Sequence, residues 1–337
     1  MAFGTRVTTT TQDYLMPKAV DTVLNSNVYF TRIVGAAKQW TFGDQLKFPI
    51  FYQKNNTGGG FTGYDLLDTN AVDTRINLAF DPSFVYKTAS IPLTELSVNA
   101  TAQKVIELAG IELQWASQSL ADDLGTQFFG SNAVATKNFL GLTDIVDDGT
   151  SVGTYGGQSR ATYTTICATK TSSSGSLSLD KMETLHNAVT SGSQAPTIGV
   201  CNETVWALYS KLLQPQERIN KDTGFVKGMR GGTGFIGLDF KGIPVLKDEK
   251  ATSGSLYFLN ENFLDFYALP FAKAKPVNFT STIDGNDYSS VKGLGFTWTD
   301  WIIPSNQAAV VSHIYFSGQH VSQNPKRQGQ LTGIVTV

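Results

Sequence analysis

The chain has 337 residues and a formal net charge of −2, a length typical of two joined domains or one large one. Charged residues make up only 16% of it, well below the roughly 25% of an ordinary soluble domain. A weakly charged surface disfavours a free subunit, so we expect further copies of the chain to cover much of it. The basic residues form no run longer than Lys326-Arg327, which excludes a tight nucleic-acid binder and leaves only weak, non-specific contact with DNA.

The first residues lack the charged and apolar regions of a signal peptide, and no stretch reaches the about 18 apolar residues of a membrane span. We therefore expect synthesis in the cytosol and no membrane association. The two cysteines, Cys167 and Cys201, are too few for a disulfide framework or a thiolate metal site. Both are expected to be inert, reduced thiols.

The N-terminal third predicts a helix followed by an extended arm. Apolar residues share one face over 13–27, which predicts a helix. A period of two begins at Asp44, where Pro49 indicates an edge strand. The segment 55–60, Asn-Asn-Thr-Gly-Gly-Gly, predicts a flexible tip, and a second extended run covers about 75–93. Together the two runs predict a long two-stranded arm with apolar residues on both faces, which a neighbouring subunit must cover.

The strongest single signal is a helix over 99–130. Apolar residues recur there every three or four positions without a proline, and Gly130 ends the pattern. At about 1.5 Å per residue this helix is roughly 40 Å long. The following segment, 141–176, is dense in Gly, Ser, Thr and Asp, which predicts a loop-rich region.

The remaining chain alternates short helices with short strands. Helices are predicted over 179–189 and 203–213. Strands are predicted over 197–201, 235–246 with a central glycine turn, 255–260, 263–269 and 308–316. A polar tail from Ser317 to Val337 follows. The order predicts an α+β protein with antiparallel sheets rather than repeated βαβ units.

Two glycine-rich motifs are reminiscent of active sites. Gly149–Gly153 matches the Gly-x-Ser-x-Gly nucleophile elbow, but neither a strand before it nor a helix after it is predicted. Gly228–Gly234 resembles a phosphate-binding loop but lacks the Gly-Lys-Ser/Thr ending. We interpret the first as a polar loop and the second as a mobile one.

The titratable residues form no catalytic or metal-binding pattern. His186, His313 and His320 have no ligand partner at helical spacing. The pair Asp122-Asp123 is expected on a solvated or intersubunit face of the long helix. No catalytic residue, cofactor or metal is therefore predicted.

The order of elements and several local phrases suggest a family. The phrases are Gly43–Pro49, Ser159–Tyr163, Ala195–Ile198, Phe240–Val245 and Leu256–Asn260. Over nearly its whole length, the chain resembles the HK97-like major capsid proteins of tailed bacteriophages. The order and spacing carry more weight in this resemblance than any one phrase.

The resemblance implies a structural shell subunit that catalyses nothing. Its implied divisions are an N-arm with the first helix (1–43), an E-loop hairpin (44–95), a P-domain with a spine helix (96–165), an A-domain (166–300), and a return strand with the tail (301–337). The implied partners are copies of the chain, which form hexamers and pentamers of an icosahedral head around double-stranded DNA. Portal, scaffolding and decoration proteins are further implied partners. The implied assembly contacts are Lys54, Asn55, Asn56, Gly58, Gly59, Gly60 and Arg160.

The chain departs from the founding member of the family in its short N-terminal arm. Only about a dozen residues precede the first predicted helix, so we expect no scaffolding segment to be removed from it. Lys54 is a candidate for the covalent crosslink of some relatives, but no catalytic glutamate is identifiable. The rival interpretations are an encapsulin-type shell and, from another class, a β-rich carbohydrate-binding or tail protein.

Overall fold

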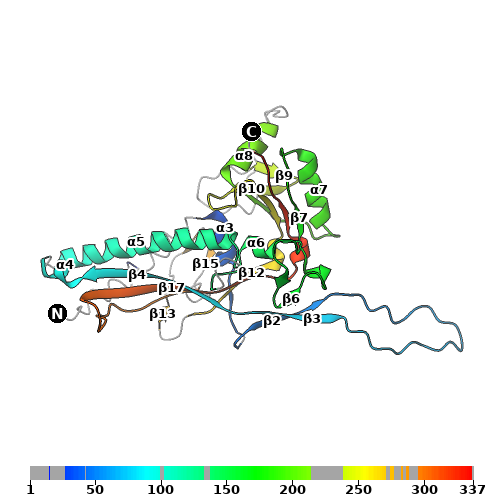
Figure 1. The fold of residues 1–337 in the computed structure, drawn as a ribbon, viewed down its shortest axis with the longest axis horizontal. Coiled ribbons are helices and arrows are strands. Elements are labelled where there is room, and N and C mark those ends of the chain that lie inside the picture. The colour runs from blue at the N-terminus through cyan, green and yellow to red at the C-terminus, as the bar shows by residue number, and fades with distance from the viewer. Residues whose placement is uncertain are drawn as a thin grey trace.

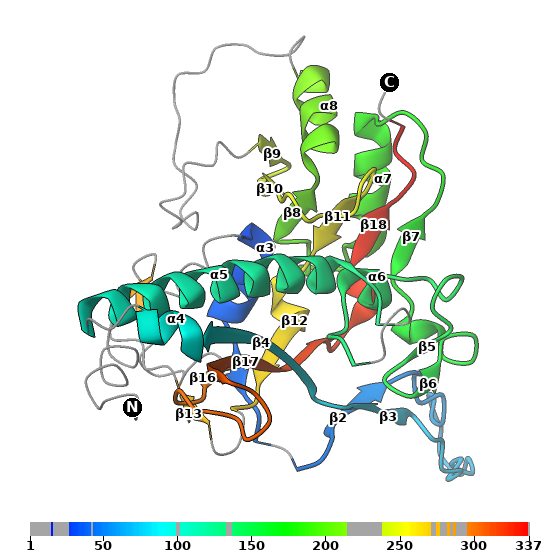
Figure 2. The same cartoon turned by 60° about the vertical axis from the view of Figure 1, so that its left-hand side comes forward.

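The computed structural model describes residue 15 and the ranges 27–41, 43–98, 102–132, 137–213, 238–270, 274–276, 282–283, 286–287 and 295–335. These residues form two six-stranded sheets, a long helix and a projecting hairpin (Figures 1 and 2). The helix predicted over 13–27 lies outside the described residues except at Leu15 and Asn27, and Asn27 has an extended backbone. The glycine-rich motif 228–234 also lies outside them.

The first sheet is built on one long strand, β17, which pairs with β4 on one side and with β12 and β16 on the other. Its strands are β1 (Lys38–Gln39), β4 (Ser83–Pro92), β12 (Leu264–Ala268), β13 (Lys275–Pro276), β16 (Phe296–Trp298) and β17 (Ala309–Ser322). The prediction ended β17 at Phe316, which was wrong. The polar residues after it continue the strand because they are buried there, and Ser317, Gln319 and His320 have internal partners for their side chains, as Ser317 Oγ has in the carbonyl of Leu269.

The long helix is confirmed as α5 (Ala102–Phe129), which has 28 residues and is followed by Gly130. It follows a short helix, α4 (Leu93–Val98), and packs against β4 (Figure 1). Its buried residues, among them Leu113 and Leu120, recur at helical spacing and face the first sheet. Burial of this stripe holds the helix, because each fully buried leucine contributes about 1.5–3 kcal/mol.

A further helix, α3 (Val28–Gly35), was not predicted. Its buried residues are Tyr29, Phe30, Ile33 and Val34, a spacing of one, three and one that places them on one face. The backbone N–H of Tyr29 donates to Asp248 Oδ2 over 3.1 Å, so a carboxylate from between β10 and β11 satisfies one orphan donor at the helix start. The spacing of these four apolar residues was the signal in the sequence that could have indicated this helix.

The second sheet has the strand order β7-β18-β11-β8-β10-β9. Its strands are β7 (Thr169–Thr171), β8 (Ile198–Cys201), β9 (Leu238–Phe240), β10 (Ile243–Lys247), β11 (Leu256–Leu259) and β18 (Gly329–Leu331). The helices α7 (Leu179–Val189) and α8 (Glu203–Leu213) have their predicted bounds. Strand β18 was not predicted, because it is a three-residue segment within the polar tail.

The sheets are mixed, which corrects the expectation of antiparallel pairing alone. The pairs β8–β10, β7–β18 and β1–β12 are parallel. Between β8 and β10 the chain passes through α8, and this return allows the second strand to run parallel to the first. The α+β class is confirmed.

The projecting hairpin consists of β2 (Leu46–Phe51) and β3 (Arg75–Phe80), paired from Leu46↔Phe80 to Phe51↔Arg75. It extends away from both sheets (Figure 1). The predicted arm was longer, because it included the residues of β4. The break at Asp81-Pro82 ends β3, and β4 then joins the first sheet instead.

Short elements complete the description. They are α6 (Leu142–Ile145), β5 (Thr154–Tyr155), β6 (Gln158–Ser159), η2 (Thr164–Ile166), η4 (Glu261–Phe263), β14 (Thr282–Ile283), β15 (Asn286–Asp287) and η6 (Pro325–Arg327). Several of them lie in the predicted loop region 141–176, which is therefore loop-rich but not featureless.

Candidate functional site

The tip of the hairpin, residues 52–74, has no helix or strand and is exposed to solvent through most of its length. The predicted contacts Lys54, Asn55, Asn56, Gly58, Gly59 and Gly60 all lie on it, and all are exposed. Asn55 Oδ1 accepts the backbone N–H of Thr57 over 2.9 Å, and Gly58 has a φ of +125° that favours glycine. Their role in assembly stays a prediction.

Sequence reasoning missed the apolar residues of the same tip. Phe61, Tyr64, Leu66 and Leu67 are each at least 64% exposed. No periodic pattern marks them, because they lie in a segment without regular structure. Their signal was the cluster of large apolar residues within a polar, glycine-rich stretch, which predicts an interaction surface.

The root of the β2–β3 hairpin is held by residues 153–160, a loop that contains the short paired strands β5 and β6. The backbone N–H of Ala79 donates to the carbonyl of Gly156 over 3.0 Å, and Gln158 Nε2 donates to the carbonyl of Asn77 over 3.1 Å. The ring of Phe80 packs against that of Tyr155 with centroids 5.1 Å apart. These contacts hold the base of the hairpin, and the rest of the hairpin projects beyond them.

The loop itself is held by Arg160, whose side chain has no exposed surface. Its guanidinium donates to the carbonyls of Asp144 (2.7 Å), Ile145 (3.1 Å) and Val152 (3.1 Å). Burial lowers the pKa of Arg160, while the nearby Asp147 carboxylate opposes that shift. Arg160 was predicted as an assembly contact. Its side chain is buried inside the subunit, where it holds this loop, and its role in assembly stays a prediction.

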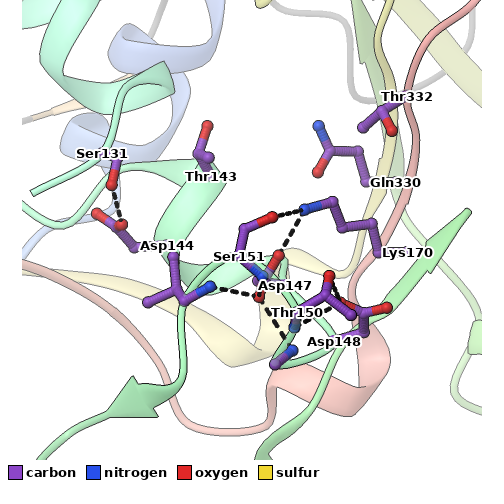
Figure 3. A network of polar contacts seen from close by, with 12 residues as sticks. Ser131, Thr143, Asp144, Asp147, Asp148, Thr150, Ser151, Lys170, Gln330 and Thr332 are labelled. Carbon is purple, nitrogen blue, oxygen red and sulfur yellow. Dashed lines mark hydrogen bonds and ion pairs between the residues drawn. The ribbon is translucent and has the colours of Figure 1, made fainter. Parts of the chain in front are cut away.

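Asp147 connects this loop to the second sheet (Figure 3). Its carboxylate accepts the backbone N–H groups of Gly149, Ser151 and Val152, and it accepts a 2.6 Å hydrogen bond from Lys170 Nζ on β7. Burial alone raises the pKa of Asp147, but the hydrogen bonds from Lys170 and the backbone outweigh it, and the pKa lies below its usual value. The carboxylate is thus held ionised between two elements.

Comparison with known structures identifies this architecture. The capsid protein of cyanophage A-1(L) matches with a TM-score of 0.63 and 14% identity, over 91% of this chain and 92% of that one. The capsid protein of the myovirus phage XM1 matches with a TM-score of 0.54 and 11% identity, again over 91% and 92%. The chain has the HK97-like capsid fold. A scan against protein-family models and a search of curated proteins by sequence found no match.

The HK97-like fold also occurs outside phage heads. The SrpI encapsulin of Synechococcus elongatus PCC 7942 matches with a TM-score of 0.54 and 9% identity, over 89% of this chain and 85% of that one. These identities show a shared fold and leave the function to be argued from the molecule itself. In HK97-like terms, α5 is the spine helix and the β2–β3 hairpin is the E-loop.

The serine of the Gly149–Gly153 motif lies in a loop, as predicted. Ser151 Oγ is 2.7 Å from Lys170 Nζ (Figure 3). A serine nucleophile needs a basic partner, but Lys170 donates to the Asp147 carboxylate as well. The contact is therefore part of the ion-paired network around Asp147.

The histidines and acids singled out in the sequence occupy separate places. His186 lies on α7, whereas His313 and His320 lie on β17. Asp122 and Asp123 form ion pairs with Lys250 and Lys87, respectively. Within the described ranges, no group of three or more His, Cys, Asp or Glu residues could hold a metal ion. Nor does a helix in this part of the chain have the length and apolar character to cross a membrane.

The two cysteines are free thiols that lie in different parts of the subunit. Cys201 is fully buried in β8, and burial raises the pKa of its thiol to about 12. Cys167 is half-buried, and its thiol donates to the carbonyl of Arg160. Burial also raises the pKa of Cys167, so neither thiol has the lowered pKa of a reactive cysteine.

Proposed function

We propose that this chain is the major capsid protein of a tailed bacteriophage, which assembles with copies of itself into an icosahedral head around double-stranded DNA. The observation that carries the proposal is the hairpin tip, with its large exposed apolar side chains, on a chain that has an HK97-like fold over about 91% of its length. The proposed role is structural.

The exposed tip supports assembly on energetic grounds. Phe61, Leu66 and Leu67 lie on the exposed tip of the projecting hairpin, where the subunit's own core does not cover them. Covering such a side chain contributes about 1.5–3 kcal/mol, and the three together offer several kcal/mol per contact. A shell repeats that contact for every subunit, so many individually weak contacts together stabilise the assembled shell.

We further propose the partners that this function implies. Copies of the chain form hexamers and pentamers, and portal, scaffolding and decoration proteins complete the head. The low charge of the chain limits contact with the packaged DNA to weak, non-specific interactions. The protein is synthesised in the host cytoplasm and resides in the virion, and the ranges 1–43, 44–95, 96–165, 166–300 and 301–337 serve as its functional divisions.

Expression of the full chain tests the proposal. Closed shells are expected in electron microscopy and in sedimentation, far larger than the 36.5 kDa subunit. Leu66→Ser with Leu67→Ser should reduce shell yield by about tenfold or more, whereas the control, Thr69→Ser with Ala71→Ser at other exposed positions of the same tip, should not.

Two results would contradict this proposal. A wild-type chain that stays monomeric or dimeric at all concentrations, even beside its scaffolding partners, contradicts shell assembly. Equal shell yield from the two double variants contradicts the role of the apolar tip.

An encapsulin-type shell is the second candidate, favoured by the likeness to the SrpI encapsulin. It differs in enclosing protein cargo instead of a genome. Genes for a portal and a terminase beside the coding gene support the phage head, and a neighbouring cargo enzyme supports the encapsulin.

A further inference from the structure

We propose that residues 153–160 form a clamp that sets the direction in which the β2–β3 hairpin leaves the subunit, with Arg160 as its positioning residue. The inference rests on the proposed function, because the direction of the hairpin matters where the tip must reach a neighbouring subunit. The clamp lies at the junction of the hairpin and both sheets (Figures 1 and 2).

The clamp holds the hairpin along the outer edge of β3. Strand β3 pairs with β2 on one side, and on the other side Ala79 donates its backbone N–H to Gly156. Two residues earlier, the carbonyl of Asn77 accepts from the side chain of Gln158. These two bonds use consecutive outward positions of the strand, so they fix both its position and its direction.

Gly156 is required for the close approach of the clamp to the hairpin. A Cβ at this position would lie 2.7 Å from Leu78 Cβ and 3.0 Å from Phe80 Cζ, closer than atoms pack. The next residue, Gly157, also has a positive φ, +78° against +55°, but a Cβ there would meet nothing within 4 Å. The chain thus contains a matched pair of glycines, of which only one touches the hairpin.

Tyr155 ties the clamp to the first sheet. Its hydroxyl donates to the carbonyl of Ser322 over 3.0 Å and accepts the backbone N–H of the same residue over 2.7 Å. Ser322 is the last residue of β17, the central strand of that sheet. The ring of Tyr155 packs against Phe80 at the end of β3, so this one side chain contacts both the sheet and the hairpin.

Arg160 and Asp147 tie the clamp to the second sheet. Arg160 is the last residue of the clamp, and its guanidinium donates to the carbonyl of Val152, the residue just before the clamp. This hydrogen bond joins the two ends of the clamp. Asp147 binds the N–H of the same Val152 and the ammonium of Lys170 on β7. The path from β7 to β3 therefore consists of polar contacts with defined directions, partly buried at Asp147 and exposed at Gln158, instead of apolar packing alone.

The matched glycines provide the experiment. Gly156→Ala and Gly157→Ala both introduce a side chain at positive φ, but only Gly156→Ala pushes against β3. Hydrogen exchange is measured on the free subunit, and shell diameter by electron microscopy. In Gly156→Ala, the Ala79 amide should exchange at least about tenfold faster, and shells should be absent or of altered diameter. Gly157→Ala carries a similar backbone strain but does not press on β3, so it should stay close to the wild type in both.

The possible outcomes test the clamp, its role in assembly and the proposed function separately. Equal Ala79 exchange in the two variants overturns the clamp. Faster exchange with normal shells overturns its role in assembly. A wild type that forms no shells overturns the proposed function, while the exchange measurement still tests the clamp. If Gly156→Ala does not fold, Gln158→Ala removes only the hydrogen bond to Asn77, and unchanged exchange at β3 in that variant would overturn the clamp as well.

Discussion

Acidification is expected to destabilise the subunit through His320. This residue lies fully buried on β17, where Nδ1 is 3.1 Å from the carbonyl of Leu140 and Nε2 is 3.1 Å from the hydroxyl of Tyr29. The carbonyl can only accept, so Nδ1 carries the proton and Nε2 accepts from Tyr29 in the neutral ring. A second proton would place a charge among Phe128 and other aromatic rings.

The magnitude follows from the shift in pKa. Burial lowers the pKa of His320 to about 4 from the usual 6.5. Because the folded pKa lies below the unfolded one, the unfolded chain binds the proton first as the pH falls. Stability is therefore complete above pH 6.5 and decreases down to about pH 4, where the loss reaches about 3 kcal/mol.

Urea unfolding at pH 7 and pH 4 measures this loss, in the Leu66→Ser, Leu67→Ser background, in which assembly is expected to be reduced. His320→Gln removes the titration, so its free energy of unfolding should fall by about 3 kcal/mol less than that of the parent. Carboxylates titrate equally in both and cancel in the difference. His313→Gln is the control on the same strand, because His313 is only half-buried. Equal losses for the parent and His320→Gln would refute the reasoning.

Three further outcomes are expected. Leu120→Ala should reduce the free energy of unfolding by about 2–5 kcal/mol because Leu120 is fully buried on α5, whereas Trp115→Ala, on the exposed face, should change it by less than about 1 kcal/mol; both follow from urea titration. Gly318→Ala should prevent stable folding, as judged by circular dichroism, because its Cβ would lie 2.1 Å from a strand carbonyl oxygen. Lys170→Met removes a hydrogen bond that lowers the pKa of Asp147. The stability that this lowered pKa contributes is present at neutral pH and lost on acidification, so the variant should lose less stability between pH 7 and pH 3 than the wild type.

The candidate site was only partly readable from the sequence. The glycine-rich tip was predicted from residue types with known backbone preferences, as Gly58 illustrates. The apolar cluster at Phe61 and Leu66 was missed because its importance depends on exposure, which no local pattern reports. Arg160 was singled out by resemblance, but its burial and its three carbonyl partners come from segments that meet only in the fold.

The sequence by itself determined the longer helices. Helix α5 and helices α7 and α8 follow from apolar periodicity and end near their predicted residues, because a repeat every 3.6 residues already specifies the buried face. Tertiary structure alone decided which strands pair. Strand β4 leaves the hairpin for β17, and β18 joins the second sheet from a polar tail. The physical reason is that strand pairing depends on partners distant in sequence, and that buried polar residues such as His320 are stabilised only by the partners that folding brings to them.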